Sequence, residues 1–208
     1  MDHRIIKGVG GEVHYWISRT KDDPKGTIVF SHGLTANHTM FEKQIEYFKS
    51  ICDYENIITF ELFKEQLKFC DGCNYCEANE KCRHRDLDSF FESFEKTDLI
   101  VFASPLYNGT FSAPLKALLD RFQFYYTYFY KHNKTQKIEK KRKAILLVSS
   151  GREGKKWLSV MEEQLKFAFS ILNIEFVGSS LCNFTDTNPQ IEKSENEIRK
   201  IVERIENL

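Results

Sequence analysis

Four cysteines in one short segment are the residues of this chain best suited to chemistry. They are Cys70, Cys73, Cys76 and Cys82, with the spacing C-x2-C-x2-C-x5-C. From one tight loop, three thiolates in a C-x2-C-x2-C run can reach three corners of a cuboidal cluster, and a fourth ligand can come from just beyond it. Gly72 stands where such a loop must turn sharply. The spacing therefore favours an iron–sulfur cluster.

Zinc and disulfide bonds are the alternatives for these thiols. Structural zinc sites usually combine two separated pairs of ligands, and the sequence has no second pair, although His84 lies close enough to Cys82 to replace a ligand. Disulfides need an oxidising compartment, and the amino-terminal residues lack the apolar stretch of a secretory signal, so we expect a cytoplasmic protein. Cys52 and Cys182 are isolated, and we expect them to act as small buried apolar residues. Zinc stays open as the alternative metal, and inert or redox-active thiols stay open after it.

The length and the charge of the chain limit the classes of protein to consider. Its 208 residues can bury one substantial core, so we expect a single domain over residues 1–208. The 30 basic and 30 acidic residues give no net charge, whereas a general nucleic-acid binder usually carries a basic excess. No apolar run reaches the length that spans a bilayer. We therefore expect neither a nucleic acid nor a membrane as a partner.

Apolar runs that suit buried strands alternate with amphipathic segments that suit helices. The strand candidates cover residues 26–31, 56–61, 98–103, 143–148 and 174–177. Helical spacing of apolar residues follows the strands, and a capping box, Ser194-Glu-Asn-Glu197, is expected to open the last helix. Because parallel neighbours need helical crossovers, the pattern predicts an α/β fold with a doubly wound five-stranded parallel sheet. Residues 11–19 are expected to form an extra antiparallel edge strand, within an amino-terminal extension of residues 1–25.

An aromatic run, Phe122-Gln-Phe-Tyr-Tyr-Thr-Tyr-Phe-Tyr130, is apolar all round at helical spacing. A helix of this kind must be buried on more than one side. It can be a core helix, or it can leave the core and enter a subunit interface, where aromatic residues are enriched. We favour the interface and therefore expect a homo-oligomer. The basic run over residues 131–143 that follows is expected to be a solvated loop.

Three loops should position a ligand, because ligands of such sheets bind beyond the carboxyl ends of the strands. The first loop, Ser31–Thr39, offers hydroxyls, backbone N–H groups and a helix N-terminus that suit a phosphate, with Gly33 and Asn37 able to take positive φ. It can equally be an ordinary turn with a good N-cap. The second loop, Ser104–Pro114, could present rigid backbone and an aromatic face to a flat ligand, and Ser149–Gly154 is a third loop of Gly/Ser type.

From about Asn56 to its end, the chain resembles the iron–sulfur flavoproteins and the related NAD(P)H-dependent FMN reductases of the flavodoxin superfamily. The pieces that carry the resemblance are F-C-D-G-C-N-Y-C with Cys82, D-L-I-V-F-A-S-P-L-Y-N-G and S-A-P-L-K-A-L-L-D-R, in matching order and spacing. The resemblance implies a flavodoxin-like sheet of strand order 2-1-3-4-5, bound FMN, and a [4Fe-4S] cluster on the four cysteines close to the flavin.

The same resemblance assigns the residues around FMN. They are Pro105, Leu106, Tyr107, Asn108 and Gly109 along the isoalloxazine, and Ser149, Ser150 and Gly151 near its other edge. The phosphate is assigned to the first loop from its own residues, Gly33, Leu34, Thr35, Asn37 and Thr39. No catalytic side chain is assigned.

The first quarter of the chain departs from this family. It has no N-G-S-P-R type phosphate loop, and residues 26–48 instead resemble the start of an α/β-hydrolase, in which a turn such as His32-Gly33 helps to form the oxyanion hole. A serine hydrolase would also need a G-x-S-x-G nucleophile elbow, and the sequence contains none.

These observations together predict an FMN-dependent oxidoreductase with an iron–sulfur cluster. It would exchange electrons with a redox carrier, either ferredoxin or NAD(P)H, and with a small-molecule acceptor. Two alternatives remain: a zinc-stabilised binding or scaffold protein of the same fold without flavin, and a hydrolase-like enzyme.

Overall fold

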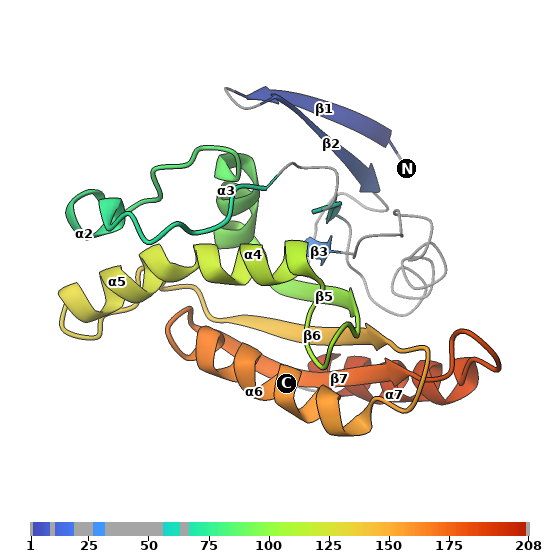
Figure 1. Cartoon of the computed structure of the whole chain (residues 1–208). Coiled ribbons are helices and arrows are strands. Elements are labelled where there is room, and N and C mark those ends of the chain that lie inside the picture. The colour runs from blue at the N-terminus through green and yellow to red at the C-terminus, as the bar shows by residue number, and fades with distance from the viewer. Residues whose placement is uncertain (1, 9–10, 19–26, 32–55, 63–66, 207–208) are drawn as a thin grey trace.

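A computed structural model of the chain describes residues 2–8, 11–18, 27–31, 56–62 and 67–206 (Figure 1). Its strands are β1 (Asp2–Gly8), β2 (Gly11–Ser18), β3 (Thr27–Ser31), β4 (Asn56–Phe60), β5 (Leu99–Pro105), β6 (Arg142–Ser149) and β7 (Ile174–Cys182). Its helices are α2 (Tyr75–Asn79), α3 (Asp88–Lys96), α4 (Ala113–Arg121), α5 (Gln123–Lys131), α6 (Lys155–Ser170) and α7 (Ile191–Glu206). None of these helices is long and apolar enough to cross a lipid bilayer.

The strands form one sheet in the order β1-β2-β4-β3-β5-β6-β7. Strand β3 pairs in parallel with both β4 and β5, and the pairs β5–β6 and β6–β7 are parallel as well. Helices α4 and α5 connect β5 to β6, and α6 connects β6 to β7, as parallel pairing requires. The α/β fold with a parallel sheet that the sequence predicts is therefore present, and the carboxyl ends of its parallel strands share one edge.

The amino-terminal strands form an antiparallel hairpin at one side of the sheet (Figure 1). Strand β2 covers most of the expected edge strand and pairs antiparallel with β4, with Ile17 opposite Ile58. Strand β1 lies outside β2 and was not expected. Its sequence, Asp-His-Arg-Ile-Ile-Lys-Gly, lacks the alternation of apolar and polar residues that marks a strand.

Apolar side chains of β5 and β6 divide between the two faces of the sheet, because successive residues of a strand point to opposite sides. Ile100, Phe102 and Leu146 face a cluster that contains residues of α3, α4 and α6. Val101 and Ile145 face a second cluster with α7. Figure 1 shows the same layers, with α4 and α6 in front of the sheet and α7 behind it.

The aromatic run forms α5, which continues α4 after a break at Phe122. Phe124 and Tyr125 are buried, and Phe124 packs edge-on against Phe91 with 5.0 Å between ring centroids. Tyr130 at the other end of the helix is 53% exposed. Helix α5 is therefore part of the core at its start and leaves the core towards its end.

The start of α7 differs from the sequence prediction. The helix begins at Ile191, so Ser194 lies within its first turn and is not the N-cap. The two residues expected to form the capping box contact β7 instead. Ser194 Oγ lies 2.6 Å from Ser180 Oγ, and Glu197 Oε2 accepts a hydrogen bond from the N–H of Leu181. These contacts with the sheet replace the local cap.

Candidate cofactor sites

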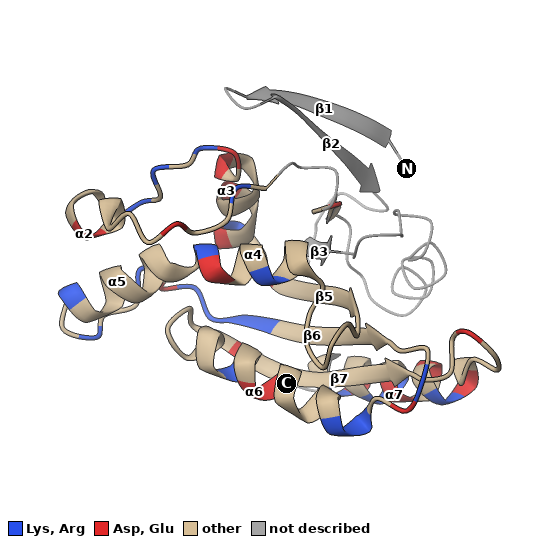
Figure 2. Ribbon diagram, in the orientation of Figure 1, with Lys and Arg blue, Asp and Glu red and all other residues tan. Residues whose placement is uncertain are grey.

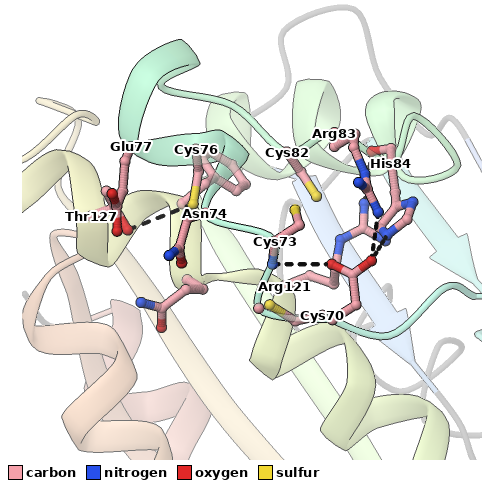
Figure 3. A pocket seen from close by; sticks show the side chains of 14 residues that line it. Cys70, Cys73, Asn74, Cys76, Glu77, Cys82, Arg83, His84, Arg121 and Thr127 are labelled. Carbon is pink, nitrogen blue, oxygen red and sulfur yellow. Dashed lines mark hydrogen bonds and ion pairs between the residues drawn. The ribbon is translucent and has the colours of Figure 1, made fainter.

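The four cysteines of the predicted cluster site line one pocket (Figure 3). The cysteine segment leaves β4, passes through the short helix α2 and leads into α3, and α2 packs against α5. The lining residues are Cys70, Asp71, Gly72, Cys73, Asn74, Cys76, Glu77, Cys82, Arg83, His84, Arg121, Gln123, Phe124 and Thr127. All four thiols are free of disulfide bonds, and Cys73 is the exposed one among them.

Left-handed backbone conformations make this segment compact. Gly72 has φ 65°, as the turn predicted at this residue requires. Asn74 and Glu80, at the two ends of α2, have φ 55° each. The N–H of Glu80 donates to the carbonyl of Cys76, which closes the helix. The chain thus reverses direction twice between the first and the last cysteine.

Asp71 organises the polar side of the pocket. Its Oδ1 accepts a hydrogen bond from the N–H of Cys73 at 3.3 Å, and its Oδ2 lies 2.6 Å from Arg83 Nη2 and 3.3 Å from His84 Nε2. Hydrogen bonding from Cys73, together with the charge of Arg83, lowers the pKa of the Asp71 carboxyl below its ordinary value, against an opposing effect of desolvation. His84, the possible substitute ligand, is therefore a partner of Asp71 in this structure.

Four thiolates are a donor set that either a cluster or a zinc ion can use. Among the described residues, no three His, Cys, Asp or Glu side chains are placed to share one ion. In a cluster each thiolate binds a different iron, so the sulfurs surround a body and do not converge on a point. The thiol of Cys76 points towards Thr127, with 3.7 Å between Cys76 Sγ and Thr127 Oγ1. The side chains of Cys73 and Cys82 point towards one another (Figure 3).

Basic residues at the end of α5 lie beside α2 (Figure 2), and side chains from there and from the segment that follows contact the cysteine segment. Lys131 Nζ donates to the carbonyl of Glu77, and Lys137 Nζ donates to the carbonyl of Glu80. His132 Nε2 lies 2.8 Å from Glu80 Oε1, and this contact is the largest cause of the lowered pKa of the Glu80 carboxyl. The run expected to be a solvated loop therefore also supports α2.

Two of the three predicted ligand loops meet at the carboxyl edge of the sheet. The N–H of Leu106 donates to the carbonyl of Ser149 at 2.8 Å. Residues 107–110 form a tight turn, in which Asn108 and Gly109 have φ 50° and 80°. The structure therefore brings Pro105–Gly109 next to Ser149–Gly151, and the assignment of both loops to the flavin stays a prediction.

The loop after β7 adds residues that the sequence analysis missed. Asn183 is buried, and its Oδ1 accepts a hydrogen bond from the N–H of Gly154 at 2.9 Å. A methyl group on Gly151 would overlap the carboxylate of Asp186. Trp157 is 41% exposed and packs its ring on Gly109. Asn183 and Asp186 directly follow the last parallel strand, β7, and this position was the signal that could have identified them.

The phosphate loop predicted for the first strand cannot be placed in this structure. The structure describes β3 up to Ser31 and no residue from 32 to 55. The predicted phosphate residues Gly33, Leu34, Thr35, Asn37 and Thr39 therefore lie outside the described residues. Their assignment stays a prediction.

The cysteine pocket and the two flavin loops lie at opposite ends of the sheet (Figure 1). Helix α5 extends beyond the point where β6 begins, and the cysteine segment packs on it, whereas Pro105–Gly109 and Ser149–Gly151 follow the carboxyl ends of β5 and β6. The described flavin-type loops and the cysteine pocket therefore lie apart within one chain, and the expectation that the cluster lies close to the flavin stays a prediction.

Comparison with known sequences places the chain among flavodoxin-like proteins. A model of the flavodoxin-like fold family matches residues 24–208 and so includes the hydrolase-like segment. An iron–sulfur flavoprotein of Archaeoglobus fulgidus is 35% identical over 63 residues, which are 30% of this chain and 32% of that protein. The match therefore spans about a third of that relative. An FMN-dependent NADH:quinone oxidoreductase of Francisella philomiragia is 27% identical over 143 residues, covering 66% of this chain and 72% of that protein.

Solved structures give the same fold. The NAD(P)H:quinone oxidoreductase from Methanothermobacter marburgensis has a TM-score of 0.60 at 14% identity and covers 85% of this chain and 92% of its own. An FMN-dependent NADH-azoreductase from Bacillus anthracis, solved in complex with FMN, has a TM-score of 0.57 at 15% identity, with coverage of 87% and 98%. The resemblance to iron–sulfur flavoproteins and NAD(P)H-linked flavin reductases is confirmed as distant homology, and the chain belongs to the flavodoxin-like fold family.

Proposed function

We propose that this chain is an FMN-dependent oxidoreductase that also carries a [4Fe-4S] cluster on Cys70, Cys73, Cys76 and Cys82. The observation that carries the proposal is the pairing of two features in one flavodoxin-like chain. Four free thiols line a single pocket, and two flavin-type loops meet at the carboxyl edge of the sheet.

The flavin part of the proposal rests on the fold and on the loops at this edge. Relatives and structural neighbours include FMN-dependent NADH:quinone oxidoreductase and NADH-azoreductase. In this chain, Tyr107 and Trp157 provide exposed aromatic surface at the turn of Asn108 and Gly109. The flavin would lie between this turn and Ser149–Gly151, and bound FMN would supply the hydride and single-electron chemistry.

The protein groups at this edge would hold and orient the ring. Backbone N–H groups in the turn at Asn108 would donate to flavin oxygens, while the side chain of Asn183 holds Gly154 in place by accepting a hydrogen bond from its N–H. The loop over residues 31–39 would hold the phosphate through N–H groups and the hydroxyls of Thr35 and Thr39. No titrating side chain is needed for these contacts.

The cluster part of the proposal rests on the donor set. Four thiolates with C-x2-C-x2-C-x5-C spacing on one pocket suit an iron–sulfur cluster. Iron–sulfur flavoproteins are among the relatives of the chain. A cluster exchanges one electron at a time, so it would link the two-electron flavin to a one-electron carrier such as ferredoxin. NAD(P)H is the other candidate donor, and a quinone-like small molecule is the candidate acceptor.

One experiment tests both cofactors. Protein purified without air should show the resolved bands of bound flavin and the broad shoulder of a cluster, with stoichiometric FMN and about four iron and four acid-labile sulfide per chain. NADH or NADPH should bleach the flavin bands, and a quinone should restore them. Stoichiometric zinc without sulfide would favour the scaffold alternative, and the absence of flavin would refute the oxidoreductase.

A further inference from the structure

A buried arginine forms hydrogen bonds with residues before and after the four cysteines. Arg121, the last residue of α4, donates from Nη1 to the carbonyl of Lys68 at 2.7 Å and to Asp86 Oδ1 at 3.0 Å. Its Nη2 donates to the carbonyl of His84 at 2.9 Å, and Asp86 Oδ2 also accepts from the N–H of Lys68. One guanidinium therefore ties together residues that stand on both sides of the four cysteines.

Stability alone does not explain a charged residue at this place. The side chain of Arg121 is 0% exposed and that of Asp86 is 11% exposed. Removing both charges from water costs more than an isolated pair usually returns, and apolar residues of similar volume often give a core of equal stability. What the pair adds is geometry, because a planar guanidinium fixes three acceptors at once.

The third nitrogen of the Arg121 guanidinium, Nε, has no hydrogen-bond acceptor among the described residues. Nε is buried and forms no hydrogen bond with any residue that the structure describes. Nε of Arg142 also has no acceptor among the described residues, but Arg142 does not line the cysteine pocket, so the position of Arg121 at the pocket distinguishes the two. The Arg121 side chain lines the cysteine pocket, so an acceptor bound in that pocket could complete its hydrogen bonding (Figure 3). Thiolate and sulfide sulfurs of a cluster are acceptors of this kind.

We propose that Arg121 is a positioning residue for the iron–sulfur cluster. It holds residues 68 and 84 so that the four thiolates keep their ligating arrangement, and its Nε–H donates a hydrogen bond to a sulfur of the cluster. Hydrogen bonds to cluster sulfurs favour the reduced, more negative form and so raise the reduction potential. The proposal rests on the proposed function, because it requires the cluster.

The test compares two conservative variants of buried arginines. Arg121→Lys keeps the positive charge but loses the planar arrangement of guanidinium donors and the Nε–H group. Arg142→Lys is the matched control, because Arg142 is equally buried, donates to the carbonyls of Phe94 and Leu172, and does not line the pocket. In anaerobic protein we expect Arg121→Lys to lose iron to a chelator 10–100 times faster than wild type. Its cluster should also have a lower reduction potential, while Arg142→Lys matches wild type in both measurements.

A second variant covers the case in which Arg121→Lys does not fold, as judged by circular dichroism. Asp86→Asn keeps Arg121 but weakens its anchor, so it should release iron faster than wild type by a smaller factor. Wild-type rates and potentials in both variants would overturn the role of Arg121 and leave the proposed function intact. Wild-type protein without iron and sulfide would instead overturn the cluster, and the role of Arg121 with it.

Discussion

The four thiols of the cysteine pocket differ in their surroundings, and this difference indicates which of them to replace. Cys73 is exposed and supports no apolar packing, whereas Cys76 and Cys82 pack against the core cluster. Cys73→Ser should therefore remove one thiolate ligand at little cost to stability. We expect the anaerobic protein to lose most of its iron and sulfide while keeping its helical and strand content.

Cys182 gives the control for this variant. It lies at the end of β7, and burial raises the pKa of its thiol above the ordinary value. Cys182→Ser should keep the iron and sulfide of wild type. A full set of iron and sulfide in Cys73→Ser would show that Cys73 is not a ligand.

Tyr125 allows a prediction of how stability depends on pH. Burial, followed by the charge of Glu95, raises the pKa of Tyr125 far above its usual range, and its hydroxyl donates to Glu95 Oε1 at 2.7 Å. A raised pKa in the folded state stabilises the protein below the unfolded pKa of about 10, and this contribution is lost as the pH rises above that value.

The comparison with Tyr125→Phe isolates this effect, because both proteins keep Arg142 nearby. At pH 7 the variant should be less stable by about 1.5–3 kcal/mol, the usual range for a hydrogen bond to a charged group. The difference should shrink above about pH 10, as measured by urea unfolding at several pH values. A difference that stays constant to pH 11 would contradict the assignment.

The sequence predicts the four cysteines of the proposed cluster but not the residues that surround them, and the reason is physical. Ligand spacing is local, so one loop encodes it. The side chain that holds both ends of this loop is Arg121, which lies 53 residues from Lys68 along the chain. Asn183 was missed for the same reason, since its partner Gly154 lies in another loop.

At the scale of the element, the turn after β5 is the feature most sensitive to a single methyl group. Gly109 has φ 80°, and a Cβ there would come within 2.8 Å of the Trp157 ring. Gly109→Ala combines a backbone cost of about 1–2 kcal/mol with this overlap, so the turn must shift. We expect FMN to bind at least about tenfold more weakly, as measured by quenching of flavin fluorescence.

Gly72→Ala is the matched control for the backbone conformation. Gly72 has a similar φ of 65°, and a Cβ there would meet nothing within 4 Å. This variant should keep the FMN affinity of wild type. Equal affinity in Gly109→Ala and wild type would show that the flavin does not use this turn.

Helix α5 carries the prediction on subunit assembly. Tyr126 and Tyr130 lie 4.6 Å apart between ring centroids on its outer part, and Tyr130 is largely exposed. If this part of the helix enters an interface, replacing both residues with Glu would place charges in a desolvated contact, which is costly without partners. We expect a wild-type oligomer and a folded, dissociated variant in analytical ultracentrifugation.

The control for helix α5 is the exposed Phe167 on α6. Phe167→Glu should leave assembly unchanged, because it adds the same charge to a different exposed aromatic position. A wild-type protein that sediments as a monomer would show that the exposed end of α5 is simply surface.

Elements with strong internal periodicity were predictable, and elements fixed by distant contacts were not. The strands β3 to β6 and the helices α3, α4 and α6 follow from runs and spacings in the sequence. The start of α7 was misplaced because Ser194 and Glu197 bind β7. Strand β1 has little apolar pattern of its own, and it is fixed by pairing with β2 along its whole length.

For the whole molecule, the two candidate cofactor sites are separated by the length of the sheet (Figure 1). The flavin loops follow the carboxyl ends of β5 and β6, while the cysteine segment rests on α5, beyond the start of β6. Sequence could not reveal this, because the position of the cysteine segment depends on α5 continuing past the sheet. Among the residues that the structure describes, the cysteine pocket and the two flavin-type loops share none.

Separate sites should respond independently to mutation, since effects of distant substitutions without shared partners usually add. Cys73→Ser should lose its iron while binding FMN within about twofold of wild type, and Gly109→Ala should weaken FMN while keeping its iron. The double variant should then show both losses at the magnitudes of the single variants. We would measure iron, sulfide and FMN affinity in all four proteins prepared without air. A flavin affinity that falls when the cluster is lost would contradict independent sites and show that the two cofactors influence each other, within one chain or across subunits.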